Sequence, residues 1–412
     1  MHEHRISNLA GHVAPQSNEI VILSYARTPI GSFGGSLSEV AVSDLGAAAI
    51  RHCFQRSGIQ QSIGPVDVDE VVFGHVLASG CGQAPVRQAA LKANIPLSVP
   101  CTSVNKVCAS GMKALTLASS LVQTGHVRVC IVGGMESMSR VPYLISSHRK
   151  GKKLGHDQLI DGLIQDGLWD VYNNQHMGNC AEKTARDLDI TREMQDEYAS
   201  LSARRATAAH ENGAFSTEIV GIDVKQGKKS RLIAVDEHIS KLQPDRLPTL
   251  SPAFEKLGSV TAGNASAISD GAAALLLSSS DFAKSRNIVP VARIVSWADG
   301  EREPIDFGIA PSIAVRKALS LASLGVEDID LWEINEAFAA VVLANAKLLG
   351  DIPLTKINIL GGAISLGHPL GCSGARIICT LLTAMKLRGA KLGCAAICNG
   401  GGGSTAVIVR MC

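Results

Sequence analysis

The sequence predicts an α/β protein built from two related halves, and two observations carry that prediction. Apolar segments rich in Val and Ile alternate with longer segments of helical pattern: residues 20–25 read as a strand, residues 42–54 as a helix and residues 70–73 as a strand. Such alternation is typical of stacked layers of helices and sheet. In addition, one arrangement of helix and strand occurs twice, which favours two halves of similar structure.

The repeated arrangement is a helix that opens on small residues, followed by an apolar strand and then by glycines. The first copy covers residues 110–134 and the second covers residues 373–403. Residues 139–267 between them are more polar, with basic patches, acidic interruptions and several prolines. We therefore predict an N-terminal half (1–138 plus 268–288), an inserted loop domain (139–267) and a C-terminal half (289–412).

Composition narrows the classes of function. The 412 residues carry a formal net charge of +2, so no overall field attracts nucleic acid or an anionic membrane. Apolar runs fall short of the ~20 residues of a membrane helix. Eleven scattered cysteines predict free thiols in a reducing compartment. Residues 1–18 are poor in acids but not rich in Arg, which favours cytoplasm over the alternative, mitochondrion.

The first candidate for chemistry is Cys108, in the segment VNKVCASG at residues 104–111. Small residues follow the thiol directly, and a helical pattern begins there. The positive end of a helix favours the nucleophilic thiolate, and its free N–H groups can receive a developing oxyanion. The position suits acyl transfer, although a lone Cys more commonly packs as a small apolar side chain.

The second candidate is His368, in a glycine-dense turn that enters the helix of the second copy. An imidazole there can accept a thiol proton and then, as a cation, hold a thiolate or donate to a carbonyl oxygen. Taken alone, a histidine at such a position is more commonly an ordinary loop histidine.

Cys398 ends the last long apolar strand and faces a run of glycines, residues 400–403. Such strand ends host catalytic groups in α/β proteins, so Cys398 is a candidate second thiol, with a buried structural Cys as the commoner alternative. The glycines lack a following Gly-Lys-Ser/Thr and a dinucleotide-binding pattern, which excludes nucleotide hydrolysis and nicotinamide binding. No zinc-site spacing is present, and we expect no metal.

Asn335 follows a predicted strand, residues 330–334, where it could orient a water or a histidine. Its alternative role is that of a helix N-cap, which Asn favours.

Four segments in this order are similar to motifs of the thiolase family, and the resemblance covers residues 19–410. They are VNKVCASG (104–111), NEAF (335–338), GHPLG (367–371) and CNGGG (398–402). The resemblance implies that Cys108 is acylated, that His368 activates it and that Cys398 exchanges the α-proton of the second substrate. It also implies that Asn335 holds a catalytic water and that the Cys108 and Gly400 amides hold the tetrahedral oxyanion.

The segment YNNQHMG at residues 172–178 resembles the branch of the family that acts on acetoacetyl-CoA. This implies an acyl pocket formed by His176, Met177 and Phe338. Implied contacts to CoA are Ser266 and Arg246, the latter in place of a lysine. Residues 298–307 resemble the mitochondrial acetoacetyl-CoA thiolases, which implies that a 2-methyl branched substrate could also be accepted.

The implied activity is acetyl-CoA C-acetyltransferase: reversible Claisen condensation of two acetyl-CoA to acetoacetyl-CoA and CoA through an acetyl group on Cys108. The implied fold is a five-layered α-β-α-β-α core of two similar halves, with a loop domain that covers CoA, assembled as a homotetramer. CoA thioesters are substrates, and no cofactor is expected. Potassium-activated members carry a tyrosine where this chain has Ala203, so potassium activation is doubtful.

Other functions stay open at this point. A 3-ketoacyl-CoA thiolase of broader chain length would use the same residues. A catalytically silent CoA-binding subunit would have lost one of them, and all four are present. A ketoacyl synthase would use a pair of histidines in place of Cys398, and no local signature of a cysteine protease occurs.

Overall fold

The computed structural model of the chain describes residues 19–55, 59–227 and 229–412. Strands and helices alternate as the sequence predicts. The first half consists of β1 (Ile20–Arg27), β2 (Gly31–Ser32), α1 (Val42–Gln55), β3 (Glu70–Gly74), α2 (Pro85–Lys92), β4 (Cys101–Val104), α3 (Ser110–Gln123), β5 (Val129–Ser137), β12 (Ser269–Ser279) and α6 (Ser280–Ser285).

The second half has the same plan. It consists of β13 (Ala292–Glu301), α7 (Ala310–Ala322), β14 (Leu331–Ile334), α8 (Ala339–Leu348), α9 (Ala363–Leu366), α10 (Leu370–Arg388), β15 (Leu392–Asn399) and β16 (Gly403–Met411).

The strand order is the same in both halves, which confirms the prediction of two related units. In the first half, β3 runs parallel to β5, β5 antiparallel to β12 and β12 antiparallel to β1. In the second half, β14, β15, β16 and β13 repeat these directions in this order. The two sets join through a short antiparallel contact between β1 and β13, at Val21 and Ile22.

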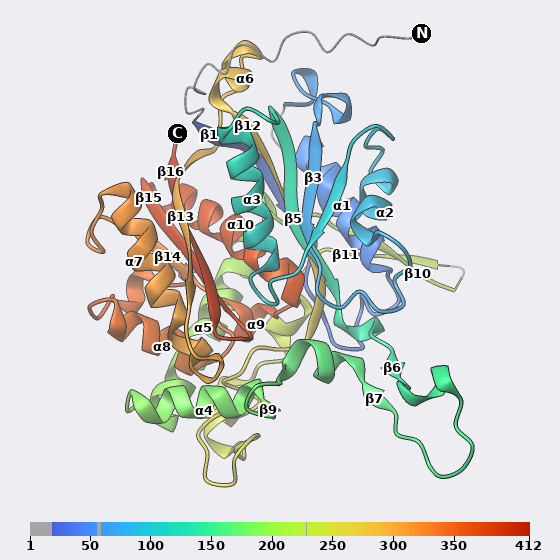
Figure 1. Cartoon of the computed structure of the whole chain (residues 1–412). Coiled ribbons are helices and arrows are strands. Elements are labelled where there is room, and N and C mark those ends of the chain that lie inside the picture. Colours follow the sequence, from blue (N-terminus) through green and yellow to red (C-terminus); the bar gives the residue numbers. More distant parts are fainter. Residues whose placement is uncertain (1–18, 56–58, 228) are drawn as a thin grey trace, which may run out of the picture.

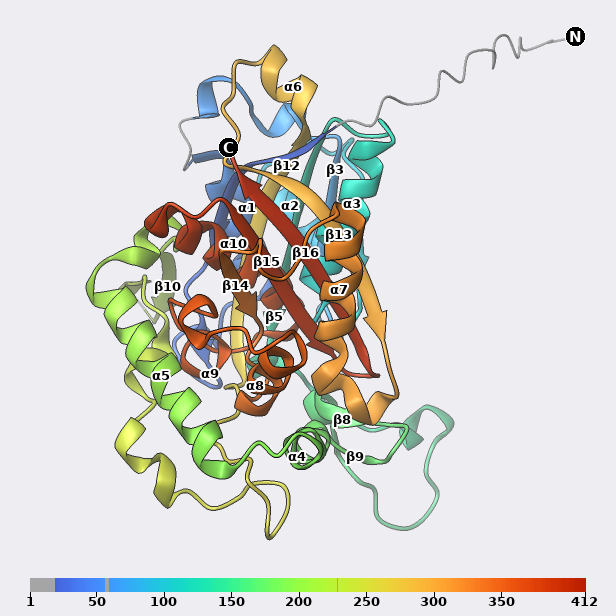
Figure 2. The ribbon, with the colours of Figure 1, turned by 90° about the vertical axis from the view of Figure 1, so that its left-hand side faces the viewer.

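The elements stack in five layers, as predicted. Helices α3 and α10 lie in the middle and pack against strands of both halves (Figure 1). Helices α1 and α2 cover the outer face of the first half, and α7 and α8 cover that of the second (Figure 2). One apolar cluster fills the middle layer, with Met112 and Leu115 from α3 and Ile377 and Leu381 from α10. This central layer places the starts of α3 and α10 side by side.

Helix α10 is both long and apolar. It is the one helix in the described part of the chain that is long and apolar enough to cross a membrane, but 89% of the window concerned is buried inside the protein. In this fold it is therefore a core helix.

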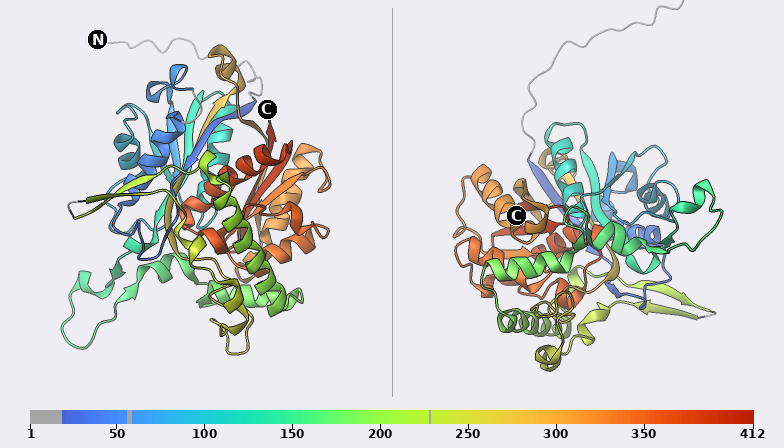
Figure 3. Two further views of the ribbon diagram at one scale, coloured as in Figure 1. Left: turned by 180° about the vertical axis from the view of Figure 1, so that it is seen from behind. Right: turned by 60° about the horizontal axis from the view of Figure 1, so that its bottom comes forward.

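The segment inserted between β5 and β12 covers one end of the two halves and also extends along their side, where its long helix lies (Figure 3). It includes an arm that projects from the body and contains the short strands β6 and β7 (Figure 1). Its regular elements are β6 (Tyr143–Leu144), β7 (Ile160–Asp161), β8 (Trp169–Asp170), β9 (Gln175–His176), α4 (Met177–Asp187), α5 (Arg192–Glu211), β10 (Ile222–Gln226) and β11 (Lys229–Ile233).

Candidate active site

A cavity of about 540 Å³ lies where both halves meet the inserted segment. Residues from all three parts of the chain line it. Most of the residues singled out from the sequence are among them: Cys108, His176, Met177, Ser266, Phe338, His368 and Gly400.

Cys108 lies in a tight turn between β4 and α3. Val107 has a positive φ of 45°, and its N–H donates to Oδ1 of Asn105 over 2.9 Å. The hydroxyl of Ser110 accepts the N–H of Lys106 at 2.8 Å. These local bonds hold the turn in a backbone conformation that a β-branched residue rarely adopts, so that the thiol lies just before the first turn of α3.

The electrostatics of Cys108 differ from the sequence-based expectation that the helix end favours thiolate. Burial raises the pKa of the thiol to about 11, and the backbone N–H groups of Gly400 and of Cys108 itself only partly oppose this. Desolvation of the charged form outweighs the amide contacts. Cys108 therefore needs a base to become a nucleophile, and the two amides are placed to bind a negative charge beside its sulfur.

His368 is the candidate for that base, and its hydrogen bonds favour one tautomer. Its Nδ1 lies 2.6 Å from the hydroxyl of Ser373, and that hydroxyl donates its own proton to the carbonyl of Pro369 at 2.9 Å. With the hydroxyl proton on the Pro369 carbonyl, Nδ1 carries the ring proton, and this arrangement leaves the Nε2 lone pair free. Nε2 is buried and has no hydrogen-bond partner among the described residues.

The imidazole is also held neutral. Burial, assisted by the nearby Arg376 guanidinium, lowers the pKa of His368 to about 3. A neutral ring with a free Nε2 can accept a proton, and the cation formed on doing so is a strong acid that returns the proton readily.

Cys398 ends β15 with 1% of its surface exposed. Burial, and to a smaller extent the Cys108 thiol, raise its pKa well above that of an ordinary thiol, which shows that the two sulfurs lie close enough to interact. Cys398 packs with Met177 and Phe338 immediately behind the cavity wall. A thiolate formed there would be an unusually strong base.

Asn335 follows β14 and is buried, with 1% of its surface exposed. Neither its amide oxygen nor its amide nitrogen has a hydrogen-bond partner among the described residues. Helix α8 starts four residues later with Phe338 as its N-cap, which excludes the N-cap alternative. A buried amide without protein partners is typical of a site for an ordered water.

The segment before His368 is fixed by Glu336. This carboxylate is fully buried and accepts the N–H of Ile364 at 3.0 Å. Its other partners are the hydroxyls of Tyr198 and Ser202 on α5 of the inserted segment, each at 2.8 Å, and the side-chain amide of Asn358 at 3.1 Å. Glu336 thus connects the strand end that carries Asn335 to the approach to His368.

One wall of the cavity is aromatic. His176 stacks on Phe254 with ring centroids 4.8 Å apart, and Phe254 meets Phe338 edge-on at 6.2 Å. Phe307 meets the other side of Phe338 at 6.3 Å. Burial lowers the pKa of His176, whose Nδ1 accepts the N–H of Gly178 at the start of α4. These rings leave a short apolar space beside Cys108.

Only one of the two predicted CoA contacts lies at the cavity. Ser266 lines the cavity, whereas Arg246 is exposed and is not among the lining residues. Two residues that the sequence analysis missed, His238 and Lys241, do line it. Lys241 is held over the cavity by an ion pair with Glu237 at 2.9 Å. They belong to no motif, and only the inserted segment's polar character hinted at a ligand-covering role.

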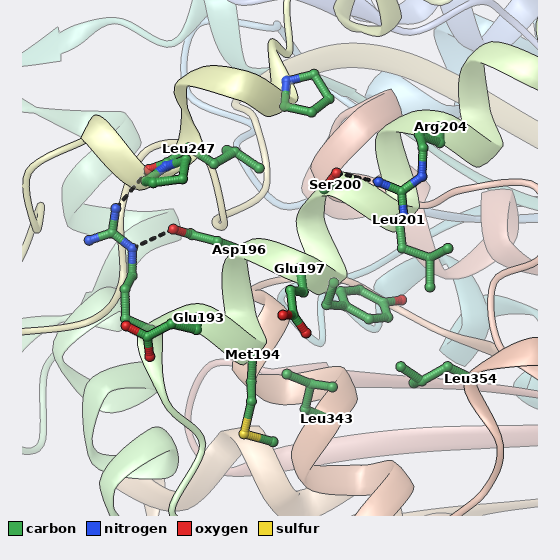
Figure 4. A pocket seen from close by; sticks show the side chains of 14 residues that line it. Glu193, Met194, Asp196, Glu197, Ser200, Leu201, Arg204, Leu247, Leu343 and Leu354 are labelled. Carbon is green, nitrogen blue, oxygen red and sulfur yellow. Dashed lines mark hydrogen bonds and ion pairs between the residues drawn. The ribbon is translucent and has the colours of Figure 1, made fainter.

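A larger cavity, of about 770 Å³, lies along α5 (Figure 4). Both arginines that line it already have partners: Arg192 donates to Asp196 over 2.7 Å, and Arg204 donates to Ser200 over 2.6 Å. None of the described residues that line it is Cys or His. Of these two cavities, only the smaller one is lined by both the candidate nucleophile, Cys108, and the candidate base, His368.

Comparison with known proteins agrees with this geometry. The family model for the N-terminal domain of thiolase matches residues 20–281, and that for the thiolase C-terminal domain matches residues 288–411.

Three curated relatives match nearly the whole chain. Acetyl-CoA acetyltransferase 2 of Arabidopsis thaliana is 50% identical over 95% of this chain and 97% of its own length. The mitochondrial acetyl-CoA acetyltransferase of Bos taurus is 49% identical over 96% and 92%. A cytosolic acetyl-CoA acetyltransferase of Gibberella zeae is 48% identical over 95% and 98%.

Two solved structures share the fold. The acetyl-CoA acetyltransferase of Bacillus anthracis superposes with a TM-score of 0.93 at 38% identity, covering 97% of this chain and all of the other. The Acat5 thiolase of Ascaris suum in complex with coenzyme A gives 0.89 at 41% identity, covering 96% and 100%.

Proposed function

The chain belongs to the thiolase family, and from that membership we infer that it is an acetyl-CoA acetyltransferase, which interconverts two acetyl-CoA with acetoacetyl-CoA and CoA. The observation that carries the inference is the arrangement of groups in one cavity. A thiol that needs a base lies with a neutral imidazole of fixed tautomer, and a second buried thiol lies behind the wall.

In the first half-reaction, Nε2 of His368 takes the Cys108 proton and the sulfur attacks the carbonyl carbon of acetyl-CoA. The oxyanion is held by the N–H groups of Cys108 and Gly400. When the C–S bond to CoA breaks, the departing CoA thiolate takes the Cys398 proton. The products are acetyl-Cys108, CoA, a His368 cation and a Cys398 thiolate.

In the second half-reaction, the Cys398 thiolate removes a methyl proton from another acetyl-CoA. Burial makes this thiolate a strong base, as the weak acidity of that proton requires. The enolate oxygen is held by the His368 cation and by a water on Asn335. The carbanion attacks acetyl-Cys108, acetoacetyl-CoA leaves, and His368 returns its proton to the Cys108 thiolate. All residues regain their starting protonation states.

Substrate length follows from the aromatic wall. His176, Phe254 and Phe338 close the space beside Cys108, so a four-carbon 3-ketoacyl group should be preferred to a longer one. CoA itself would lie across Ser266 with Lys241 near the mouth of the cavity, and Arg246 would reach it only at the exposed end. We place the loop domain at residues 139–267, where it contributes this covering wall.

The assembly we propose is a homotetramer. Strand β4 lies at the edge of the sheet and offers free backbone groups for pairing with a second copy. The projecting arm exposes large apolar side chains, with Tyr143 63%, Leu154 94% and Leu159 65% exposed, which a second dimer would cover. Light scattering should give four copies for the whole chain and two for a variant without the arm.

The relatives include cytosolic and mitochondrial proteins. We propose the cytoplasm for this chain, with mitochondrion as the alternative, and imaging of a fluorescent fusion would decide between them.

To test the function, the purified protein is incubated with acetoacetyl-CoA and CoA, and the rate is measured as loss of the acetoacetyl absorbance. A parallel reaction uses 3-ketohexanoyl-CoA in place of acetoacetyl-CoA. Strong preference for the four-carbon substrate supports the proposal. Comparable rates would mean a broader 3-ketoacyl-CoA thiolase, and binding without turnover would mean a silent CoA-binding subunit.

A further inference from the structure

A buried carboxylate outside the reaction described above holds the turn that carries His368. Glu136 lies near the end of β5 in the first half and has none of its surface exposed. It accepts three backbone N–H groups: those of Val76 and Leu77, each at 3.1 Å, and that of Gly371 at 2.8 Å. Gly371 belongs to the second half, so this carboxylate bridges the two halves by backbone contacts.

The other side of the Gly371 peptide is enclosed by glycines. A Cβ atom at Gly74 would lie 2.6 Å from the carbonyl oxygen of Gly371, one at Gly111 2.8 Å and one at Gly134 1.9 Å. All three distances are too short for a side chain, so the sequence keeps glycine where the Gly371 carbonyl enters. With Glu136 on its N–H and the three glycines around its carbonyl, Gly371 is held at both of its peptide bonds by the first half.

The position of this peptide links the two candidate catalytic groups. Gly371 lies three residues after His368, and Gly111 lies three residues after Cys108. Their close contact joins the first turns of α10 and α3. A shift of the Gly371 peptide would therefore change the distance between the imidazole and the thiol directly.

We propose that Glu136 is a positioning residue for the reaction: through the Gly371 N–H, it holds the His368 turn at the distance from Cys108 that proton transfer needs. This rests on the proposed roles of Cys108 and His368. A displacement of about 1 Å in such a pair can cost roughly 10²-fold in rate.

The surroundings of Glu136 show why backbone N–H groups are needed. The nearest basic group is His75, whose Nε2 lies 3.4 Å from Oε1, and burial lowers the pKa of His75 to about 4. Burial raises the pKa of Glu136 to about 7, and nearby Asp270 adds to this. His75 is thus neutral near pH 7, and the three N–H donors stabilise the charge of the carboxylate.

The experiment compares Glu136→Gln with Glu218→Gln. Glutamine keeps the shape at position 136 but turns an NH₂ group toward backbone N–H groups. Glu218 is a matched control because it is also a fully buried carboxylate, but it pairs with Arg27 at 2.6 Å away from the cavity. Three quantities are measured: kcat and KM for acetoacetyl-CoA thiolysis, the rate of Cys108 alkylation by iodoacetamide, and the melting temperature.

For Glu136→Gln we expect kcat to fall roughly tenfold to 10²-fold, KM for CoA to stay within about twofold, and Cys108 alkylation to slow in parallel. Glu218→Gln should melt at lower temperature with wild-type kcat and alkylation. A folded Glu136→Gln protein with wild-type kcat and alkylation would overturn the proposal, whatever its melting temperature.

Two further outcomes distinguish the positioning role of Glu136 from a folding defect and from failure of the proposed function. If Glu136→Gln does not fold, Glu136→Asp, which keeps the charge on a side chain one methylene shorter, must show the same losses in milder form, and wild-type values there would contradict the proposal. If the wild-type protein has no thiolase activity but Glu136→Gln still slows Cys108 alkylation, the proposed function fails and the positioning role stands.

Discussion

The turns that carry Cys108 and His368 occupy equivalent places in the two halves, each just before the central helix, yet they are held by different means. The Cys108 turn is fixed by a cation: Nζ of Lys106 donates to Asp299 at 2.7 Å and to the carbonyl of Ser404 at 3.0 Å, both in the second half. The His368 turn is fixed by a buried carboxylate of the first half, Glu136, which accepts the Gly371 N–H.

Each turn is thus anchored in the opposite half. The difference lies in exposure: Asp299 and Lys106 are partly open to solvent, with 35% and 18% of their side chains exposed, whereas Glu136 is fully buried. The two halves thus present the same backbone position twice, with the Cys108 thiol at one and the His368 imidazole at the other.

The largest effects are expected when each of the two thiols is removed in turn. Cys108→Ala should abolish acetylation by acetyl-CoA, because no acceptor sulfur remains. Cys398→Ala should still be acetylated at Cys108 but condense about 10²–10⁴-fold more slowly, since the base is lost. Mass spectrometry after a single addition of acetyl-CoA checks the first step. Equal loss of acetylation in both variants would contradict the division of roles.

The tautomer of His368 can be tested next. Ser373→Ala removes the only partner of Nδ1 found among the described residues and lets the ring proton move to Nε2, so kcat should fall roughly 10- to 100-fold. Ser373→Thr keeps the hydroxyl and serves as the control. Steady-state thiolysis rates measure the effect, and an unchanged rate in the alanine variant would show that the tautomer is set by another group.

The cation anchor of the Cys108 turn should have a smaller effect. The bonds from Lys106 and Lys113 outweigh burial and lower the pKa of Asp299 to about 2. The contribution of ionised Asp299 to stability is therefore complete above the unfolded pKa of about 4 and is lost as pH falls through about 2. Asp299→Asn should lower the free energy of unfolding near pH 7 by about 1 kcal/mol, after discount for solvent screening.

Denaturant melts at several pH values measure this difference. The wild type and Asp299→Asn should converge as pH approaches 2. A gap that stays constant with pH would mean that the charge of Asp299 contributes nothing and that only its shape matters.

The smallest effect concerns potassium. The approach to His368 is held by Glu336 and Ser202, and the nearby Ala203 on α5 offers no hydroxyl ligand. Thiolysis rates in KCl and in NaCl of equal ionic strength should therefore agree. A rate several times higher in KCl would show that a cation still contributes to holding this turn.

The sequence was sufficient for the halves, the central helices and the residues on motifs, because these depend on local pattern. The repeat predicted the two halves, whereas the stacking in five layers was predicted only from the resemblance to the thiolase family. Ser373 and Glu136 were not foreseen, since their importance comes from a hydrogen bond to a ring nitrogen and from a peptide of the other half. Neither leaves a mark in the local sequence pattern.

The same limit applies to charge. The position of Cys108 before a helix predicted a lowered thiol pKa, but burial, which depends on the whole fold, raises it to about 11. Lys241 escaped notice because it lies in the inserted segment, where loops determine which side chains reach the cavity. Arg246, chosen by alignment, lies on the exposed side of that segment.

The place of α10 in the chain has a consequence for biosynthesis. The inner face of the first half, with α3, β5 and β12, is covered by a helix that begins only at Leu370, so the ribosome completes this face long before its cover exists. During that interval the nascent chain presents a broad apolar surface, the kind of intermediate that aggregates or recruits chaperones. Truncation before Leu370, which removes α10, should therefore impair the solubility of the first half.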